Sequence, residues 1–278
     1  METFYQKVIL ITGAASGIGR ELAFQLAGHG ATVIATDVNE AGVEAVADEV
    51  RRRGGKADYY RLNVTDYHAV RMLIKLIKSE YEHLDYVFCN AHVELDGEVR
   101  NIPVENWERL LNVNLNGAIY TATEAYKIMM NQGSGHIITT AAPASDGSEP
   151  VAYQLTREAL ISFSRALQDK AKETGVRVSA FCPSYETNPA FEPFLSVEVP
   201  KEELFGLDQY QKIPVETVVD QLLKSVAANR ELITMPLYTK LIAWMTRFSS
   251  PLMRTIAMPD SPGYKSVRKV TIQPDRSI

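Results

Sequence analysis

The stretch from Lys7 to Arg20, KVILITGAASGIGR, places the strongest constraint on how this chain can fold. It begins with the apolar run 8–11, rich in β-branched residues, which predicts a strand buried on both faces. A glycine-bearing turn follows over residues 12–19, and from Arg20 to His29 the apolar spacing becomes helical. Strand, glycine turn and helix form a unit that holds a pyrophosphate, because glycines let the backbone approach and the helix start attracts negative charge.

The glycine spacing is TGxxxGxG, formed by Thr12, Gly13, Gly17 and Gly19, and differs from the GxGxxG of the common dinucleotide fingerprint. This variant resembles the glycine motif of the short-chain dehydrogenase/reductase family. Segments similar to further motifs of that family follow in its order, and the resemblance covers residues 5 to about 236. It implies a single α/β domain with a Rossmann-like, doubly wound parallel sheet of about seven strands and helices on both faces.

Strand-like and helix-like segments alternate along the chain, as such a sheet requires. The 278 residues, 46% of them hydrophobic, are enough for one large domain with a substantial core. We expect strands at 8–11, 32–36, 57–62, 85–89, 135–142, 176–182 and 232–235, and helices at 20–29, 40–53, 66–82, 104–132, from 151 onward, and at 215–229. The domain is expected to span residues 1–236, with a substrate lid at about 190–214 and a C-terminal extension at 237–278.

Asp37 ends the second expected strand and indicates which dinucleotide binds. An acid at this place accepts hydrogen bonds from the adenosine ribose hydroxyls and repels a 2′-phosphate. Phosphate-binding members of the resembled family often carry a basic residue just after this acid or inside the glycine turn, where this chain has Val38 and Ser16. The expected cofactor is therefore NAD(H) rather than NADP(H). An N-cap role of Asp37 for the helix 40–53 is compatible with this function.

Two more segments resemble motifs along the cofactor's path. Asn63-Val64 stands where the family usually has Asp-Val, whose acid reads the adenine amino group, and the amide oxygen of Asn63 can still accept a hydrogen bond. Asn90-Ala91-His92 resembles the family's NAG turn, with His92 replacing the glycine. The expected cofactor-binding residues are Gly13, Ser16, Gly17, Ile18, Gly19, Asp37, Asn63, Val64, Asn90, Ala91, Arg157 and Pro183.

The segment Tyr153–Arg157, YQLTR, resembles the family's catalytic YxxxK motif with arginine replacing lysine. In the family the tyrosine protonates or deprotonates the substrate oxygen, and a phenol, with a pKa of about 10, needs a nearby cation for this task. Arg157 supplies that charge. It is larger than lysine, never deprotonates and presents a planar fork, so proton relay through this position is lost or rerouted.

Other positions around the expected nicotinamide either match the family or differ from it. Asn114, within an NVNxxG-like segment, maps onto the catalytic asparagine that kinks its helix and holds a proton-relay water. His92 is either an acid/base or substrate contact, or a tolerated turn residue. The family's catalytic serine aligns with Ala142 along the strand, whereas counting back from Tyr153 gives Thr140. The loop serines Ser145 and Ser148 are further options. The expected catalytic residues are Tyr153, Arg157, Asn114, Thr140 and His92.

Three functions are compatible with this altered pocket. The first is an NAD(H)-dependent dehydrogenase or reductase acting on a hydroxyl or carbonyl of a hydrophobic small molecule. The second is a non-redox enzyme on the same fold, such as a cyclase, isomerase or lyase. The third is a catalytically inactive NAD(H)-binding protein. Fold alone does not decide among them. Apolar residues in the lid suggest an apolar substrate, or they hold the lid down.

The C-terminal extension carries apolar residues at helical spacing and a net charge of +5, from seven basic and two acidic residues. Such a basic amphipathic segment can contact an anionic membrane surface, here through 237–256, or dock on a sister subunit. A homodimer or homotetramer is expected, because the helices 104–132 and from Val151 pair across subunits in the resembled family.

Composition and cysteine usage set the remaining expectations. The formal net charge is −5, and the run Arg51–Arg53 is interpreted as a solvated helix end, so no nucleic-acid partner is expected. Neither a signal peptide nor a spanning apolar run is found, so a cytoplasmic protein is expected. Cys89 and Cys182 end separate buried strands and are expected to be free, inert thiols. No cluster with metal-ligand spacing is present in the sequence.

Overall fold

The computed structural model describes residues 2–93, 99–141, 151–183 and 213–234, and within the helix that begins at Val151 it does not describe the side chains of 152–154. All of these residues belong to one unit, which spans residues 1–237. The predicted lid, apart from Ile213 and Pro214, and the whole extension 237–278 lie outside the described residues.

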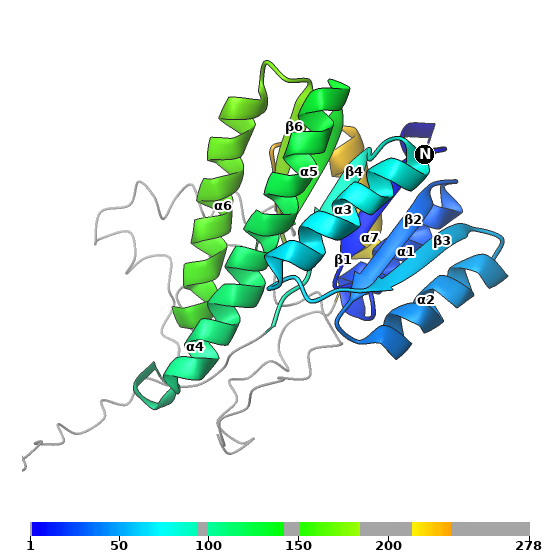
Figure 1. Cartoon of the computed structure of the whole chain (residues 1–278). Coiled ribbons are helices and arrows are strands. Elements are labelled where there is room, and N and C mark those ends of the chain that lie inside the picture. Colours follow the sequence, from blue (N-terminus) through cyan, green and yellow to red (C-terminus); the bar gives the residue numbers. More distant parts are fainter. Residues whose placement is uncertain (1, 94–98, 142–150, 184–212, 235–278) are drawn as a thin grey trace, which may run out of the picture. The chain divides into compact units, whose positions relative to one another are not determined.

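The described residues form a seven-stranded, all-parallel sheet with helices on both faces, as predicted (Figure 1). The strands are β1 Val8–Thr12, β2 Thr32–Asp37, β3 Lys56–Arg61, β4 Tyr86–Cys89, β5 Gly135–Thr140, β6 Val176–Cys182 and β7 Leu232–Thr234. The helices are η1 Glu2–Phe4, α1 Gly17–Gly28, α2 Glu40–Arg52, α3 Tyr67–Tyr81, η2 Val99–Asn101, α4 Val104–Leu110, η3 Leu111–Gly117, α5 Ala118–Gln132, α6 Val151–Ala171 and α7 Val215–Ala227. The strand order is β3-β2-β1-β4-β5-β6-β7.

The two faces of the sheet build two separate cores, because side chains alternate along each strand. In β1, Ile9 and Ile11 pack with the buried faces of α1, α2 and α7. Val8 and Leu10 point to the opposite core, which α3, α5 and α6 cover. All five residues of β1 are buried, as the apolar run predicts for a central strand.

Two helices differ from their predicted bounds. The helix expected at 20–29 begins at Gly17, so Gly17 and Gly19 form its first turn rather than a preceding loop. The helix expected at 104–132 is continuous in the chain but changes form in the middle, where Leu111–Gly117 is a π-helix between α4 and α5. π-Helical segments are rare and are frequent at functional sites, and this one carries Asn114.

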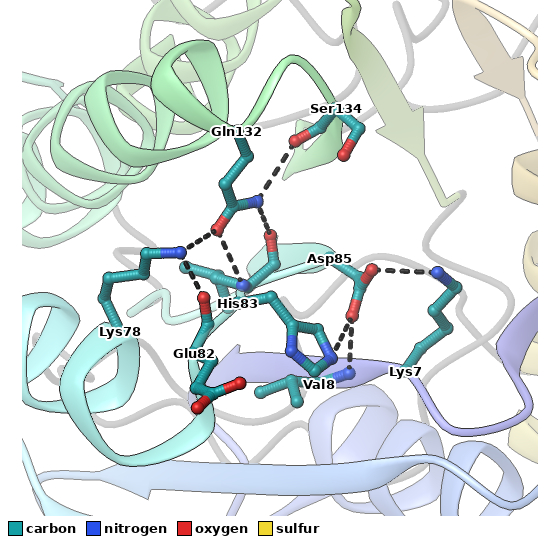
Figure 2. A network of polar contacts seen from close by, with 9 residues as sticks. Lys7, Val8, Lys78, Glu82, His83, Asp85, Gln132 and Ser134 are labelled. Carbon is teal, nitrogen blue, oxygen red and sulfur yellow. Dashed lines mark hydrogen bonds and ion pairs between the residues drawn. The ribbon is translucent and has the colours of Figure 1, made fainter.

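A polar network fixes the amino-terminal edge of the sheet (Figure 2). The Asp85 carboxylate accepts hydrogen bonds from Lys7 Nζ and from the backbone N of Val8, both at 2.9 Å, and thereby joins the starts of β1 and β4. At the end of α5, the Gln132 amide accepts from the backbone N of Leu84 and donates to its carbonyl oxygen, both at 3.0 Å. The network lies at the edge opposite the glycine turn and therefore stabilises the scaffold.

His136, in β5, makes the stability of this fold depend on pH. Its Nε2 lies 2.8 Å from Ser179 Oγ, and that hydroxyl donates to the carbonyl oxygen of Arg230 at 2.7 Å, so Nε2 carries a proton and donates to Ser179. Burial, together with the charge of Arg177, lowers the pKa of His136 to about 3 from 6.5. As pH falls from 6.5 towards 3, His136 is protonated in the unfolded chain but stays neutral in the folded chain. The free energy of unfolding therefore decreases.

We expect His136→Gln to remove this part of the pH dependence. The wild type should lose about 2 kcal/mol more than the variant between about pH 7.5 and about pH 5, as measured by urea unfolding. His68→Gln, at an exposed histidine, is the matched control and should follow the wild type. Equal pH dependence in the wild type and His136→Gln would show that His136 is not held neutral.

The structure confirms that Cys89 and Cys182 are free, buried thiols. Burial raises the pKa of each to about 12, so both stay protonated. In the part of the chain that the structure describes, no helix is long and apolar enough to cross a bilayer.

Candidate active site

The strand order reverses direction between β1 and β4, and in such sheets ligands bind outside the carboxyl ends of the strands at this point. Thr12 ties the two strand ends together there. Its hydroxyl accepts hydrogen bonds from the backbone N of Asn90 at 3.0 Å and of Ala91 at 3.1 Å, and donates to the Phe88 carbonyl oxygen at 3.4 Å. The glycine turn and the NAG-like turn are thus held side by side.

The glycine turn is packed so closely that side chains are excluded from it. Gly13 has φ +68°, and a Cβ on it would lie 2.7 Å from Ala91 Cα. A Cβ on Gly19 would lie 2.0 Å from the Gly13 carbonyl oxygen and 2.8 Å from Asn90 Nδ2. The N-cap of α1, Ser16, makes no side-chain capping hydrogen bond, which leaves the first N–H groups of the helix for an anion or water. These features fit a pyrophosphate.

Asp37 lies beside this turn and is held by two backbone donors. Its Oδ2 accepts from the N of Ala15 at 3.0 Å and its Oδ1 from the N of Asn39 at 2.9 Å. The N-cap of α2 is Asn39, whose side chain accepts from Gly42 N, so Asp37 is not the cap. Each carboxylate oxygen keeps a second lone pair for a ribose hydroxyl. The next residue, Val38, is 60% exposed and brings no positive charge.

Asn63 and Val64 follow β3 at the same edge of the sheet. Asn63 is exposed, and its Oδ1 accepts hydrogen bonds from the backbone N of Thr65 at 3.1 Å and from the Thr65 hydroxyl at 2.9 Å. The oxygen expected to read the adenine is therefore already used within the turn. Val64 is buried, and its side chain fills the space beside Gly117, where a Cβ would lie 2.6 Å from Val64 Cγ2.

Asn90 is buried between the glycine turn and β5. Its Nδ2 donates to the Gly13 carbonyl oxygen at 3.3 Å, and its Oδ1 accepts from the Thr140 hydroxyl at 3.4 Å. Thr140, the last residue of β5, thus lies close to the centre of the site. The buried side chain of Asn90 therefore stabilises the glycine turn through Gly13 and is not exposed to a ligand.

His92 lies at this same turn with its ring partly accessible. Its Nδ1 is 2.9 Å from the Asn90 carbonyl oxygen, which places the proton on Nδ1 in the neutral ring. Packing around the ring lowers the pKa of His92 although the residue is exposed overall, and the hydrogen bond with Asn90 acts in the opposite direction. The lowered pKa favours the neutral ring, with its proton on Nδ1.

Asn114, buried in the π-helix, forms hydrogen bonds with the backbone of the residue after His92. Its Oδ1 accepts from the backbone N of Val93 and its Nδ2 donates to the Val93 carbonyl oxygen, both at 2.8 Å. Each end of the amide makes one hydrogen bond to Val93, so the side chain fixes the turn. The structure shows a π-helix around Asn114, where the resemblance implies a kinked helix.

Arg157 lies in α6 with only 3% of its surface exposed. Its positive charge opposes the effect of burial on the pKa of Cys182, which places the guanidinium near the carboxyl end of β6. Pro183, partly buried, follows that strand. Tyr153 lies one helical turn before Arg157, and this spacing puts the two residues on one face of α6. The side chain of Tyr153, and Ala142, Ser145 and Ser148, lie outside what the structure describes.

The structure therefore brings the glycine turn, Asp37, Asn90, Thr140 and the turn held by Asn114 to one edge of the sheet. Sequence reasoning missed three supporting residues, namely Thr12 as the link between strands, Val93 as the partner of Asn114, and Gly117 as the contact of Val64. Thr12 and Gly117 were visible within the matched motifs. Among the described residues, no three His, Cys, Asp or Glu side chains are grouped as metal ligands.

Comparison with known proteins agrees with this arrangement. Residues 7–193 match the short chain dehydrogenase family. A cyclohexanol dehydrogenase from Acinetobacter sp. strain SE19 is 30% identical over 208 residues, which are 73% of this chain and 82% of the relative. A 3beta-hydroxysteroid dehydrogenase from Mediterraneibacter gnavus is 31% identical over 195 residues, which are 69% of this chain and 70% of the relative.

Solved structures share the fold. A short chain dehydrogenase/reductase from Burkholderia phymatum in complex with NAD has a TM-score of 0.79 at 23% identity, covering 94% of this chain and 100% of that chain. Another solved short-chain oxidoreductase is in complex with NADP, so similar proteins bind NAD or NADP. With its glycine turn, its strand order and the match over residues 7–193, this chain belongs to the short-chain dehydrogenase/reductase family of oxidoreductases.

Proposed function

We propose that this protein is an NAD(H)-dependent oxidoreductase that interconverts a hydroxyl and a carbonyl on a hydrophobic small molecule, with an arginine in the place of the family's active-site lysine. The observation that carries the proposal is the buried Arg157, a fixed positive charge one helical turn from Tyr153 and near the end of β6. The names of two relatives, a cyclohexanol dehydrogenase and a 3beta-hydroxysteroid dehydrogenase, support a hydrophobic alcohol as substrate.

In this proposal the chain's own residues bind and orient the substrate, and they move a proton to or from it. Tyr153 protonates or deprotonates the substrate oxygen, and the charge of Arg157 lowers the pKa of that phenol. Asn114 fixes the turn beside the substrate through Val93. Thr140, or a serine of the following loop, orients the substrate oxygen, and His92 acts as an acid/base or contacts the substrate. Bound NAD(H) supplies or takes up the hydride.

The dinucleotide would be held by the glycine turn and by Asp37. The first N–H groups of α1, at Gly17, Ile18 and Gly19, would meet the pyrophosphate, with Ser16 at the helix cap. Asp37 would accept from the ribose hydroxyls through the lone pairs that its backbone donors leave. Asn63-Val64 would border the base, and Ala91, Pro183 and Arg157 the nicotinamide half.

Asp37 should make the protein prefer NADH over NADPH. A 2′-phosphate beside this carboxylate would be repelled, and no basic residue follows at Val38. We expect Asp37→Ala to lower the ratio of the NADPH to the NADH dissociation constant by about tenfold or more, as measured by calorimetry. Asp37→Asn keeps an acceptor oxygen for only one of the two backbone donors, Ala15 or Asn39, and should also bring the two dissociation constants closer together, because the charge is lost. Equal affinity of the wild type for both cofactors would contradict the assignment.

Arg157 offers a direct test of the chemistry. If the protein is a dehydrogenase slowed by its arginine, Arg157→Lys should raise turnover of NAD with a hydrophobic alcohol, because lysine restores a compact proton-carrying cation. Adding Ala142→Ser should raise it further, by about tenfold or more, through a new donor to the substrate oxygen. If the native chemistry is non-redox, the same two changes should instead lower the native activity, because the guanidinium fork would then hold the substrate.

We also propose a homodimer or homotetramer that forms through α4, α5 and α6. Ala118, Ala122 and Ala125 of α5 are buried in the chain's own core. Among the described side chains, Val104, Val151 and Leu155 are the exposed large apolar residues on α4 and α6. Light scattering at micromolar concentration measures the assembly. Membrane contact through 237–256 and a cytoplasmic location stay predictions, since the extension lies outside the described residues.

A further inference from the structure

A small apolar cluster connects the turn after β4 with helix α4 and belongs to neither of the two cores. Among the residues that the structure describes, it consists of the buried Ile102 and Leu110 and of Val93 and Trp107, which are partly buried and pack against them. Small clusters of this kind form where a long connection packs on the body of a domain. Here the connection is the one that leaves β4 beside the candidate site.

Leu110 is the fully buried member of this cluster. It ends α4, directly before the π-helix, and precedes Asn114 by four residues, so the two side chains lie close to one face of the helix. Both act on Val93. Asn114 holds its backbone with two hydrogen bonds of 2.8 Å, and the cluster that contains Leu110 packs against its side chain. Val93 is therefore fixed by its backbone and by its side chain.

The imidazole of His92, the residue before Val93, depends on the course of this turn. Its Nδ1 lies 2.9 Å from the Asn90 carbonyl oxygen, which can only accept, so Nδ1 carries a proton. The hydroxyl of Thr12 holds the backbone N of Asn90 at one end of the turn. At the other end, Asn114 and the cluster hold Val93. The imidazole keeps its bond to Asn90 only while both ends stay in place.

We infer that Leu110 is a positioning residue, which holds the turn through Val93 and thereby keeps the His92 imidazole in the orientation that is hydrogen-bonded to Asn90. Shortening Leu110 leaves a space beside Val93, and the surrounding chain relaxes into it in part. A misplacement of about 1 Å at a reacting group can lower a rate by about 100-fold. The inference rests on the proposed function, since this orientation affects a reaction only if His92 acts as an acid/base or contacts the substrate.

The first measurement is the tautomer of His92, read from the ring-nitrogen NMR shifts of the full chain at about pH 8, where the ring is neutral. His92→Ala identifies the signals. The wild type should carry its proton on Nδ1. In Leu110→Ala the shifts should move towards those of the exposed His68, because an imidazole in water exchanges between both tautomers. Leu110→Met conserves the side-chain volume and should keep the wild-type shifts.

Leu223→Ala is the matched control. Leu223, in α7, is also fully buried, but it packs in the core on the other face of the sheet. The same truncation there destabilises the protein without touching the turn, so it should leave the His92 shifts unchanged.

The second measurement is kcat/KM for NAD reduction with cyclohexanol, in a double-mutant cycle with His92→Ala. Leu110→Ala should lower kcat/KM by about tenfold or more when His92 is present. In the His92→Ala background the same change should cost less than about twofold, because the group that Leu110 positions is then missing. A purely structural role of Leu110 would give the same loss in both backgrounds.

Trp107→Ala, at a partly buried member of the cluster, repeats both measurements if Leu110→Ala does not fold. Wild-type His92 shifts in the cluster variant, or equal changes in that variant and in Leu223→Ala, would overturn the inference. An equal loss of kcat/KM with and without His92 would overturn it as well. If the wild type reduces no NAD, the proposed function fails, and the His92 tautomer still decides whether Leu110 holds the imidazole.

Discussion

Tyr153→Phe is expected to lower turnover by about 10²- to 10⁴-fold, the range that general acid–base catalysis contributes. Tyr153 lies in α6 one turn before the buried Arg157, and its family role is to exchange a proton with the substrate oxygen. Phenylalanine keeps the ring and removes only the hydroxyl. The affinity for NADH should change little, because the glycine turn and Asp37, which would hold the dinucleotide, belong to other elements.

The measurement is the initial rate of NADH formation with a hydrophobic alcohol, together with NADH binding by fluorescence. Tyr5→Phe, at a tyrosine that is 61% exposed and precedes β1, is the matched control and should keep the wild-type rate. Full activity in Tyr153→Phe would remove the tyrosine from the mechanism, and with it the main reason for assigning the family's chemistry to this chain.

Gly19→Ala is expected to lower NADH affinity by about tenfold or more, and the free energy of unfolding by about 1–3 kcal/mol. The new methyl group would lie 2.0 Å from the carbonyl oxygen of Gly13, and also close to Asn90 Nδ2. The first of these is a backbone atom in the turn that would cradle the pyrophosphate, so the overlap can be relieved only by moving that turn. Asn90 would lose its support of Gly13 at the same time.

Gly28 in the same helix provides the control, because a Cβ there meets nothing within 4 Å. Gly28→Ala should leave NADH affinity unchanged and stabilise the helix by up to about 1 kcal/mol. Calorimetric binding and urea unfolding measure both quantities for both variants. If Gly19→Ala binds NADH and unfolds like Gly28→Ala, the close packing of Gly19 against Gly13 is not needed for binding or for stability.

Most of the fold could be predicted from the sequence because its signals are local. The apolar run of β1 and the periodicity of α2, α3 and α7 fixed these elements to within about two residues. The π-helix at Leu111–Gly117 could not be predicted from periodicity, because one inserted residue changes the hydrogen-bond pattern without breaking the apolar pattern. The early start of α1 was missed because glycines are typical of turns, and here two of them form the first helical turn.

The candidate site was less predictable, since its geometry depends on contacts between distant segments. The motifs placed Asp37 and Asn90 at the site, but not the backbone donors that hold Asp37 or the buried position of Asn90 below the turn. Asn63 appeared free to accept from adenine, and only the structure shows that Thr65 uses its oxygen. The burial of Arg157 likewise depends on packing across α6 and β6 and has no signature in the sequence.

The proposed function requires that the protein transfers a hydride, and NADH formation measures this most directly. The wild type is incubated with NAD and with cyclohexanol or a 3β-hydroxysteroid, and the reverse reaction is followed with NADH and the matching ketones. We predict that the wild type forms NADH and ketone in equal amounts. Tyr153→Phe should lose the formation of both. Tight NADH binding with no cofactor turnover in either direction, across a panel of such alcohols and ketones, would contradict the account.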